Sequence, residues 1–174
     1  MVAFSADKRT FFRKMAKGGG DLIRPPWSVE EYLFVELCRN CNACVEACPE
    51  TIIQFDSRKQ PFLNFHSGEC TFCADCVTVC DTGALHKTHP DAQPWDTSVS
   101  LKQGCLSEQN TLCRSCGEVC QYDALHFPRN MTAITKPEID TEQCIGCGAC
   151  VSICPTEALD VQYHYSNKSI KNYA

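Results

Sequence analysis

The sequence lacks a long hydrophobic run, and this absence excludes a membrane-spanning helix. Such a helix needs about 20 consecutive apolar residues, whereas the longest candidate, residues 32–37, is interrupted by Glu36. The sequence also lacks a Ser/His/Asp array, a phosphate-binding loop and paired catalytic carboxylates, so it does not predict an enzyme. Aromatic residues at 9% and charged residues at 21% are not so biased as to indicate wholesale disorder.

Positive charge is scarce over most of the chain. Residues 25–174 hold ten basic residues against nineteen acidic ones, whereas residues 1–24 hold six basic residues against two acidic ones. A protein that binds nucleic acid carries its basic face on the folded part. The acidic body therefore excludes nucleic acid as a partner, and the basic residues form a separate N-terminal arm.

Cysteine, in contrast, is abundant, with 16 cysteines among 174 residues. They fall into four groups of four, and none is left over. Groups one to four are, in chain order, Cys38, Cys41, Cys44 and Cys48; Cys70, Cys73, Cys76 and Cys80; Cys105, Cys113, Cys116 and Cys120; and Cys144, Cys147, Cys150 and Cys154.

Groups one, two and four share the spacing C-x2-C-x2-C-x3-C, the pattern of bacterial ferredoxins. In that pattern three cysteines bind one [4Fe–4S] cluster from a tight loop, and the fourth cysteine is carried by a short helix to a neighbouring cluster. Gly146 and Gly148 suit such a loop because glycine accepts positive φ. Pro49 and Pro155 follow the fourth cysteine, where we expect the first turn of a helix.

Two other uses of cysteine fit the spacing poorly. A disulfide framework needs an oxidising compartment, and cysteines three residues apart on a tight loop are badly placed to pair. A zinc site usually combines two separated C-x2-C pairs, and the third closely spaced cysteine is one thiolate too many. The pattern therefore predicts iron–sulfur clusters.

Group three departs from the pattern because seven residues, 106–112, separate Cys105 from Cys113 where two are expected. Either this segment bulges out and Cys105 is still a ligand, or Cys105 is not a ligand. We expect ligation by Cys105, since no cysteine is otherwise unassigned. The sequence thus predicts three [4Fe–4S] clusters, and a fourth that depends on Cys105.

The groups are embedded in repeated short elements, which predict an α+β fold of two tandem bacterial-type 2[4Fe–4S] ferredoxin units with little regular secondary structure. One hairpin is expected from strands 52–55 and 62–65, and another from strands 124–127 and 133–139. The expected regions are a basic arm (1–30), ferredoxin unit 1 (31–90), a Pro-bearing linker (91–98), ferredoxin unit 2 (99–165) and a C-terminal tail (166–174).

The hairpins within groups one–two and three–four favour sequential pairing. A nested arrangement, in which group one pairs with four and two with three, stays open because the intervals between groups are alike. Under sequential pairing the four ligand sets are Cys38, Cys41, Cys44 and Cys80; Cys70, Cys73, Cys76 and Cys48; Cys105, Cys113, Cys116 and Cys154; and Cys144, Cys147, Cys150 and Cys120.

The N-terminal arm resembles a twin-arginine export motif over residues 7–14, with Lys8 in place of the first arginine. No apolar stretch and no small-residue cleavage site follows, so we expect no export. The arm is either a solvated basic segment or a docking segment. In the second case the candidate partner-binding residues are Lys8, Arg9, Arg13 and Trp27.

The whole chain resembles the NapF family, the ferredoxin-type accessory proteins of periplasmic nitrate reductase systems. The resemblance rests on the basic arm ending in residues 23–27, the order of the four groups, the extended segment from Cys105 to Cys113, and the closing run 144–150. It implies a cytoplasmic protein that binds the precursor of the nitrate reductase catalytic subunit. That protein would assist maturation of the precursor before export, by supplying a cluster or electrons. The alternative function is a general electron relay between redox partners.

Overall fold

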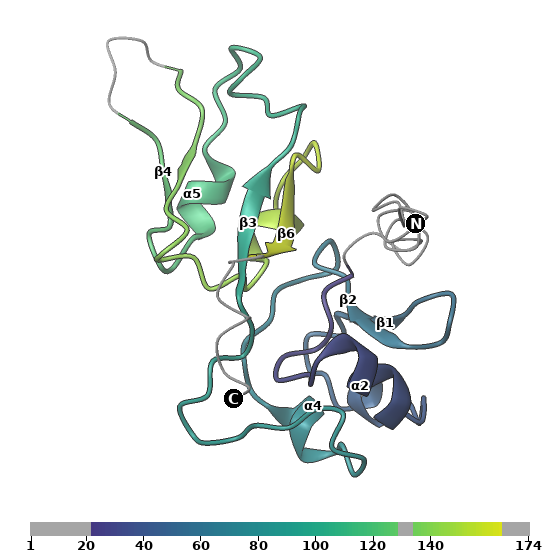
Figure 1. The fold of residues 1–174 in the computed structure, drawn as a ribbon. Helices are drawn as coiled ribbons and strands as arrows, with labels where there is room; N and C mark the ends of the chain where they lie inside the picture. Colours follow the sequence, from purple (N-terminus) through teal and green to yellow (C-terminus); the bar gives the residue numbers. More distant parts are fainter. Residues whose placement is uncertain (1–21, 129–133, 165–174) are drawn as a thin grey trace, which may run out of the picture.

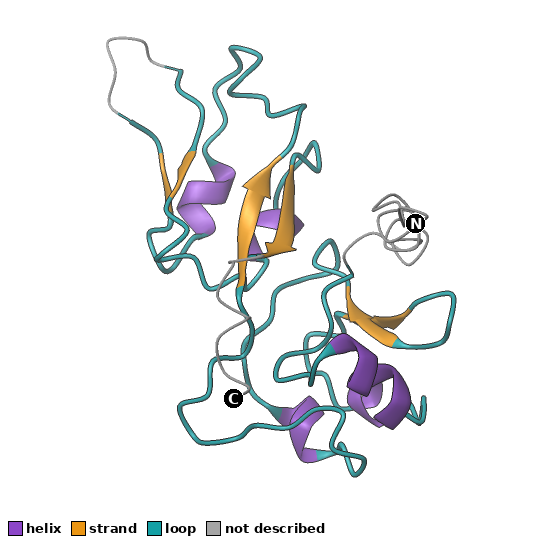
Figure 2. Ribbon diagram, in the orientation of Figure 1, coloured by secondary structure: helices purple, strands orange, loops and turns teal. Residues whose placement is uncertain are grey.

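The computed structural model describes residues 22–128 and 134–164, which form short helices and two-stranded sheets joined by long loops (Figures 1 and 2). The helices are α2 (Glu31–Leu37), α3 (Ala43–Glu46), α4 (Asp75–Thr78), α5 (Ser115–Val119) and α6 (Ala149–Ser152). The strands are β1 (Ile53–Phe55), β2 (Pro61–Leu63), β3 (Thr97–Leu101), β4 (Leu125–His126), β5 (Glu138–Ile139) and β6 (Leu159–Tyr163).

Strands β1 and β2 form the first predicted hairpin, with Ile53 opposite Leu63. Its turn is closed by Asp56, whose Oδ1 accepts hydrogen bonds from the backbone N–H groups of Arg58 (2.8 Å) and Gln60 (2.9 Å). A side-chain oxygen that binds backbone two residues ahead favours a turn over continued strand. The prediction of this hairpin is confirmed.

Strands β4 and β5 pair antiparallel, with Leu125 opposite Ile139, so the second predicted pairing is also confirmed. Part of its predicted turn and the first residue of its second strand, residues 129–133, lie outside the described residues. The sequence did not predict the longest sheet, in which β3 and β6 pair from Thr97 opposite Tyr163 to Leu101 opposite Leu159. Along the chain, groups three and four lie between the two strands of this sheet, because β3 precedes group three and β6 follows group four.

The described residues form two lobes. Figure 1 shows α2, α4 and the β1–β2 hairpin in a first lobe (residues 22–90), and β3, β6, α5 and β4 in a second lobe (residues 97–164). Strand β3 begins at Thr97, inside the segment 91–98 that the sequence suggests as a linker. Trp95, in the same segment, is partly buried against the core.

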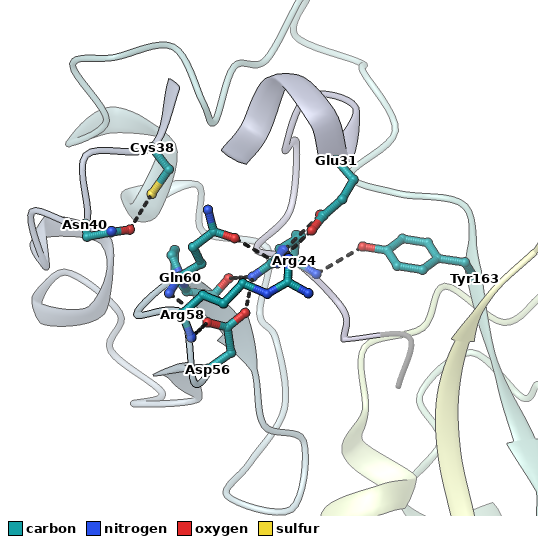
Figure 3. A network of polar contacts seen from close by, with 9 residues as sticks. Arg24, Glu31, Cys38, Asn40, Asp56, Arg58, Gln60 and Tyr163 are labelled. Atoms are coloured by element: carbon teal, nitrogen blue, oxygen red, sulfur yellow. Dashed lines mark hydrogen bonds and ion pairs between the residues drawn. The ribbon is translucent and has the colours of Figure 1, made fainter. Parts of the chain in front are cut away.

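The chain is already packed before α2, although the sequence places the arm as far as residue 30. Residues 23–27 are all buried. The guanidinium of Arg24, a residue only 5% exposed, donates to both carboxylate oxygens of Glu31 (2.9 and 2.7 Å) and to the carbonyl of Pro61 (3.0 Å). It also forms an ion pair with Asp56 at 3.4 Å (Figure 3). Arg24 therefore fastens this segment to both α2 and the hairpin.

The hydrophobic core is small and is built around the cysteines. Its most buried side chains include Phe34, Ile52, Val151 and Leu159, and most of the cysteines are buried in this core or pack against its edge. A chain of this size with so few large apolar residues gains little stability from burial alone. Such a core is typical of a protein that needs bound metal to stay folded.

Two further expectations are settled by the backbone. Pro49 and Pro155 do not begin helices: α3 and α6 end at Glu46 and Ser152, and each proline lies in the turn that follows. Proline is common just past a helix end because it cannot continue the helix, so the expected helix start is wrong. Within residues 22–128 and 134–164, no helix is long and apolar enough to span a bilayer.

Candidate metal centres

Each cysteine group is built from a tight loop that runs into a helix of one turn. The third cysteine of every group lies on such a helix: Cys44 on α3, Cys76 on α4, Cys116 on α5 and Cys150 on α6. The three-residue step to the fourth cysteine then passes the end of the helix. The helix therefore carries the fourth thiol away from the loop that holds the first three, as the spacing predicts.

The loops of groups one, two and four require left-handed backbone at two positions. In group four these are Gly146 (φ 68°) and Gly148 (φ 85°), which confirms the role expected for both glycines. Residues Asn40 and Asn42 hold the same positions in group one, with φ of 55° and 67°. Asparagine tolerates this region better than most residues. In group two the positions fall to Phe72 and Ala74, with φ of 55° and 65°.

Three cavities are each lined by four cysteines, three from one group and the fourth from its neighbour. Their empty volumes, open solvent included, are about 390, 330 and 350 Å³. In the same order the cysteines are Cys38, Cys41, Cys44 and Cys80; Cys48, Cys70, Cys73 and Cys76; and Cys105, Cys113, Cys116 and Cys154.

The remaining four cysteines also lie together. The buried Cys150 interacts electrostatically with Cys147, Cys144 and Cys120. The four sets of neighbouring thiols therefore match the sequential arrangement and not the nested one.

These sets do not have the dimensions of a single-ion site. All sixteen cysteines are free thiols, and in the described part of the chain no three His, Cys, Asp or Glu side chains are close enough to hold one metal ion. A tetrahedral zinc ion needs its sulfurs about 2.3 Å from the metal, which would bring them into mutual contact. Four thiols spread around a hollow fit a larger iron–sulfur cluster, for which four cysteines are the usual ligands.

Burial makes the thiolates unfavourable without a metal. Burial, with repulsion from neighbouring cysteines, raises the pKa of Cys44 and of Cys116 to about 11. The same two causes raise the pKa of Cys70 and Cys76 to about 12. The thiolate is the form that binds metal. Because burial disfavours the thiolate, positively charged iron must stabilise it, so metal binding and thiol deprotonation are coupled.

Three of the four fourth cysteines also receive backbone hydrogen bonds. The N–H groups of Leu85, Ala124 and Ala158 donate to the sulfurs of Cys80, Cys120 and Cys154 at 3.3–3.4 Å. Burial raises the pKa of Cys80, but its hydrogen bonds with the Thr82 hydroxyl and with backbone N–H groups outweigh burial and lower the pKa overall. The pKa of Cys154 is lowered in the same way. Hydrogen bonds to cluster sulfurs are one of the protein's means of setting a reduction potential.

In group three the long insertion folds back on itself. Within it, the N–H of Gln109 donates to the carbonyl of Cys105 at 3.2 Å, and the hydroxyl of the buried Ser107 donates to the carbonyl of Cys113 at 2.7 Å. These bonds hold the two ends of the insertion together, so Cys105 and Cys113 line the same cavity. Of the two alternatives for this group, the structure has the bulged loop with Cys105 at the cavity.

The candidate partner-binding residues divide into two sets. Lys8, Arg9 and Arg13 lie outside the described residues. Trp27 is 7% exposed, its indole N–H donates to the carbonyl of Ala92 at 2.8 Å, and the ammonium of Lys87 lies 4.9 Å from its ring centroid. A side chain buried in this way is not offered to a partner, so the expectation for Trp27 is corrected: it anchors the segment 23–27 to the first lobe.

Sequence reasoning missed Ser107, Arg24 and Trp95 as residues that shape the site. Ser107 gives no signal because a serine in a polar insertion is ordinary. Arg24 was counted with the basic arm, although its position next to two prolines and a tryptophan marks a packed segment. Trp95 is a large aromatic residue in a segment suggested as a linker, and this exception to linker composition was the available signal.

The fold and these sites define the class: a ferredoxin-type iron–sulfur protein that binds [4Fe–4S] clusters. The family model described as a 4Fe-4S dicluster domain matches residues 37–84, and that of a 4Fe-4S binding domain matches residues 137–160. Neither describes a catalytic domain. The first match covers groups one and two, and the second covers group four.

Comparison with characterised proteins gives the family. The chain is 34% identical to the ferredoxin-type protein NapF of Escherichia coli (strain K12) over 156 residues, 90% of this chain and 92% of that protein. It is 36% identical to NapF of Haemophilus influenzae over 137 residues, 79% of this chain and 77% of that protein. A methylamine utilization ferredoxin-type protein, MauM of Methylophilus methylotrophus, is 30% identical over 76% of this chain and 66% of its own length. The chain belongs to the NapF family of ferredoxin-type proteins.

Proposed function

We propose that the chain is a cytoplasmic accessory protein that binds the precursor of a periplasmic nitrate reductase catalytic subunit and assists its maturation before export. The observation that carries the proposal is the similarity to NapF over nine-tenths of the chain. The sequence similarity to NapF extends beyond the cysteine groups, because the aligned residues include residues outside both matched domains. A shared framework outside the metal centres is expected where related proteins use the same docking surface.

We further propose that all four sets of cysteines bind [4Fe–4S] clusters in the four sequential combinations, which the three cysteine-lined cavities support. A bound [4Fe–4S] cluster supplies one-electron chemistry. Around it the chain supplies thiolate ligands, N–H donors to the fourth cysteine and a nearly apolar wall. The wall of the first cavity includes Phe34, Phe55 and Val79 beside the cysteines.

The ligand set that contains Cys105 is tested by Cys105→Ser. Iron and acid-labile sulfide are counted on the anaerobically purified protein beside the wild type, together with paramagnetic resonance spectra. We expect the variant to lose one cluster's iron or to show an altered signal from one cluster, with the others unchanged. Equal iron and an identical spectrum would remove Cys105 from the ligand set.

Precursor binding is tested by capture from cytoplasm with the tagged full chain. We expect the unexported catalytic subunit to be recovered, and nitrate reductase activity to fall in a deletion strain. Failure of capture together with full nitrate reductase activity in the deletion strain would overturn the proposal.

The contribution of the arm is tested with Lys8, Arg9 and Arg13 changed together to alanine. We expect weaker capture at unchanged iron content, because none of the three residues belongs to a cysteine group. The matched control changes three other basic residues, Lys136, Lys168 and Lys171, to alanine, which removes the same charge elsewhere. Equal capture by both triple variants would show that the arm is a solvated segment without a docking role.

A second candidate function is a general electron relay. It is favoured by the similarity to MauM, whose name refers to methylamine utilization and not to nitrate. As a relay, the protein would need all its clusters to be stable and redox-active, and removing the arm would change little. The two functions differ in whether the precursor is captured and in whether the arm is required.

A further inference from the structure

The two lobes meet at the cysteine loops of groups two and four. The backbone N–H of Cys70, the first cysteine of group two, donates to the carbonyl of Cys147, the second cysteine of group four, at 2.8 Å. The two thiols also interact electrostatically. A direct backbone hydrogen bond between two metal-binding loops from different lobes leaves no other element between them.

Trp95 packs against both loops at this junction. Its ring lies edge-on to Phe72 in the group two loop, with centroids 5.4 Å apart, and its indole N–H donates to the carbonyl of Ile145 in the group four loop at 2.8 Å. Its ring is also edge-on to Phe65 at 6.1 Å. Aromatic pairs in this geometry contribute beyond the area that they bury. Trp95 therefore fixes the distance between the two loops.

Gly148 brings the lobes closer than any other residue could. A methyl group at this position would overlap the ring of Phe65 in the first lobe. Gly148 also has a φ of 85°, so the glycine serves both the loop of group four and the contact between lobes. A second tie lies farther away, where the N–H of Arg24 donates to the hydroxyl of Tyr163 on β6 at 3.0 Å (Figure 3).

Within each lobe the two metal centres are also adjacent. In the first lobe α3 packs against α4, and Cys44 of group one interacts electrostatically with Cys76 of group two. In the second lobe α5 packs against α6, and Cys116 of group three interacts with Cys150 of group four. The three adjacencies therefore join groups one and two, groups two and four, and groups four and three.

From these three adjacencies we infer that the four centres form one unbroken row in the order one, two, four, three, in which the Cys70–Cys147 contact passes electrons between the lobes. With [4Fe–4S] clusters held by the two groups, an electron that crossed this contact would oxidise one cluster by one electron and reduce the other by one electron. No bond is made or broken, and no proton moves. Trp95 is the positioning residue of the crossing.

The order has a consequence for the irregular third group. Group three lies at one end of the row, next to group four alone, whereas groups two and four lie in the middle. Loss of a centre at group three shortens the row without interrupting it. Under this order, groups one and three are the ends at which electrons from a partner would enter or leave.

The test compares Trp95→Ala with Trp27→Ala in the full holo-protein, reduced photochemically without any partner. The two residues are a matched pair, because each indole N–H donates to a backbone carbonyl at 2.8 Å, but only the acceptor of Trp95 lies in a cysteine loop of the other lobe. Neighbouring reduced centres broaden each other's paramagnetic resonance and speed its relaxation. At equal iron content we expect Trp95→Ala to lose part of this broadening and to saturate at lower microwave power, with Trp27→Ala unchanged.

A second matched pair uses glycine. Gly148→Ala and Gly83→Ala both place a methyl at positive φ (85° and 74°), but only the methyl at position 148 meets the other lobe, since nothing lies within 4 Å of position 83. We expect loss of coupling in the first variant alone. Spectra of Trp95→Ala and Gly148→Ala that equal the wild-type spectrum at full iron would overturn the row.

If the junction variants lose iron, hydrogen exchange on the wild-type holo-protein decides instead. The amide of Cys70 should then exchange slowly, as its bond to Cys147 requires, and exchange as fast as that of an exposed loop would overturn the junction. The inference does not depend on the proposed precursor. If the precursor is not captured but the centres remain magnetically coupled, the proposed function alone is wrong. If the wild-type protein captures the precursor but its centres are not coupled between the lobes, the inferred row alone is wrong.

Discussion

At the scale of single residues, one backbone position is repeated in all four groups. The third residue after each fourth cysteine takes a positive φ: Thr51 (54°), Gly83 (74°), Asp123 (49°) and Glu157 (52°). In three groups the turn sends a following N–H back to the cysteine sulfur. Only one group uses glycine, the residue to which this conformation costs least. The other three groups therefore carry strain to make the turn.

Glu157→Gly should relieve this strain. Left-handed backbone costs an ordinary residue about 1–2 kcal/mol, and glycine gives back about half of that through its greater freedom in the unfolded chain. We expect the holo-protein to gain roughly 0.5 kcal/mol and a slightly higher Tm, measured anaerobically by the loss of cluster absorbance. Gly83→Ala is the reverse change and should lower the Tm. A lower Tm for Glu157→Gly would show that the glutamate side chain has a role that the turn does not explain.

At the scale of elements, the cysteine spacing predicted local structure better than the pattern of apolar residues predicted the strands. Positions three apart require a tight loop with left-handed residues, so the role of Gly146 and Gly148 followed from chemistry alone. The β1–β2 hairpin was predictable because its turn is local. The β3–β6 sheet was not, since it pairs residues about 60 positions apart in strands of five residues whose composition is mixed. Such pairing is fixed by tertiary context.

The insertion of group three is the element with the least support from spacing, so its internal hydrogen bonds should decide its stability. Ser107→Ala removes the bond from this buried hydroxyl to the carbonyl of Cys113 and leaves a partly buried acceptor without this donor. We expect a cost of about 1–2 kcal/mol and faster loss of one cluster's iron to a chelator. Ser100→Ala is the control, because its hydroxyl donates to the carbonyl of Asp160 in the β3–β6 sheet and not within the insertion. Equal iron release from both variants would contradict this account.

At the scale of the whole molecule, the boundary between arm and body decides what the N-terminus does. Composition places that boundary after the basic residues, near residue 30, because charge and glycine were the visible signals. The structure has Ile23 to Trp27 buried, with the N–H of Leu63 donating to the carbonyl of Ile23 at 2.8 Å. The segment 23–27 is therefore part of the fold of the first lobe.

Two truncations separate these roles. Deletion of residues 1–21 should keep iron content and Tm while weakening capture of the precursor, because it removes basic residues of the arm and none of the described residues that form the first lobe. Deletion of residues 1–27 also removes Trp27 and Arg24. Loss of a buried tryptophan costs about 3–5 kcal/mol, and loss of the guanidinium leaves Asp56, whose side chain is 8% exposed, without its ion pair. The longer deletion should therefore lose the iron bound by group one, whose cavity adjoins Pro61 and Phe34. Iron counting and capture on both truncated proteins check this, and equal iron in the two would show that the segment 23–27 is dispensable to the fold.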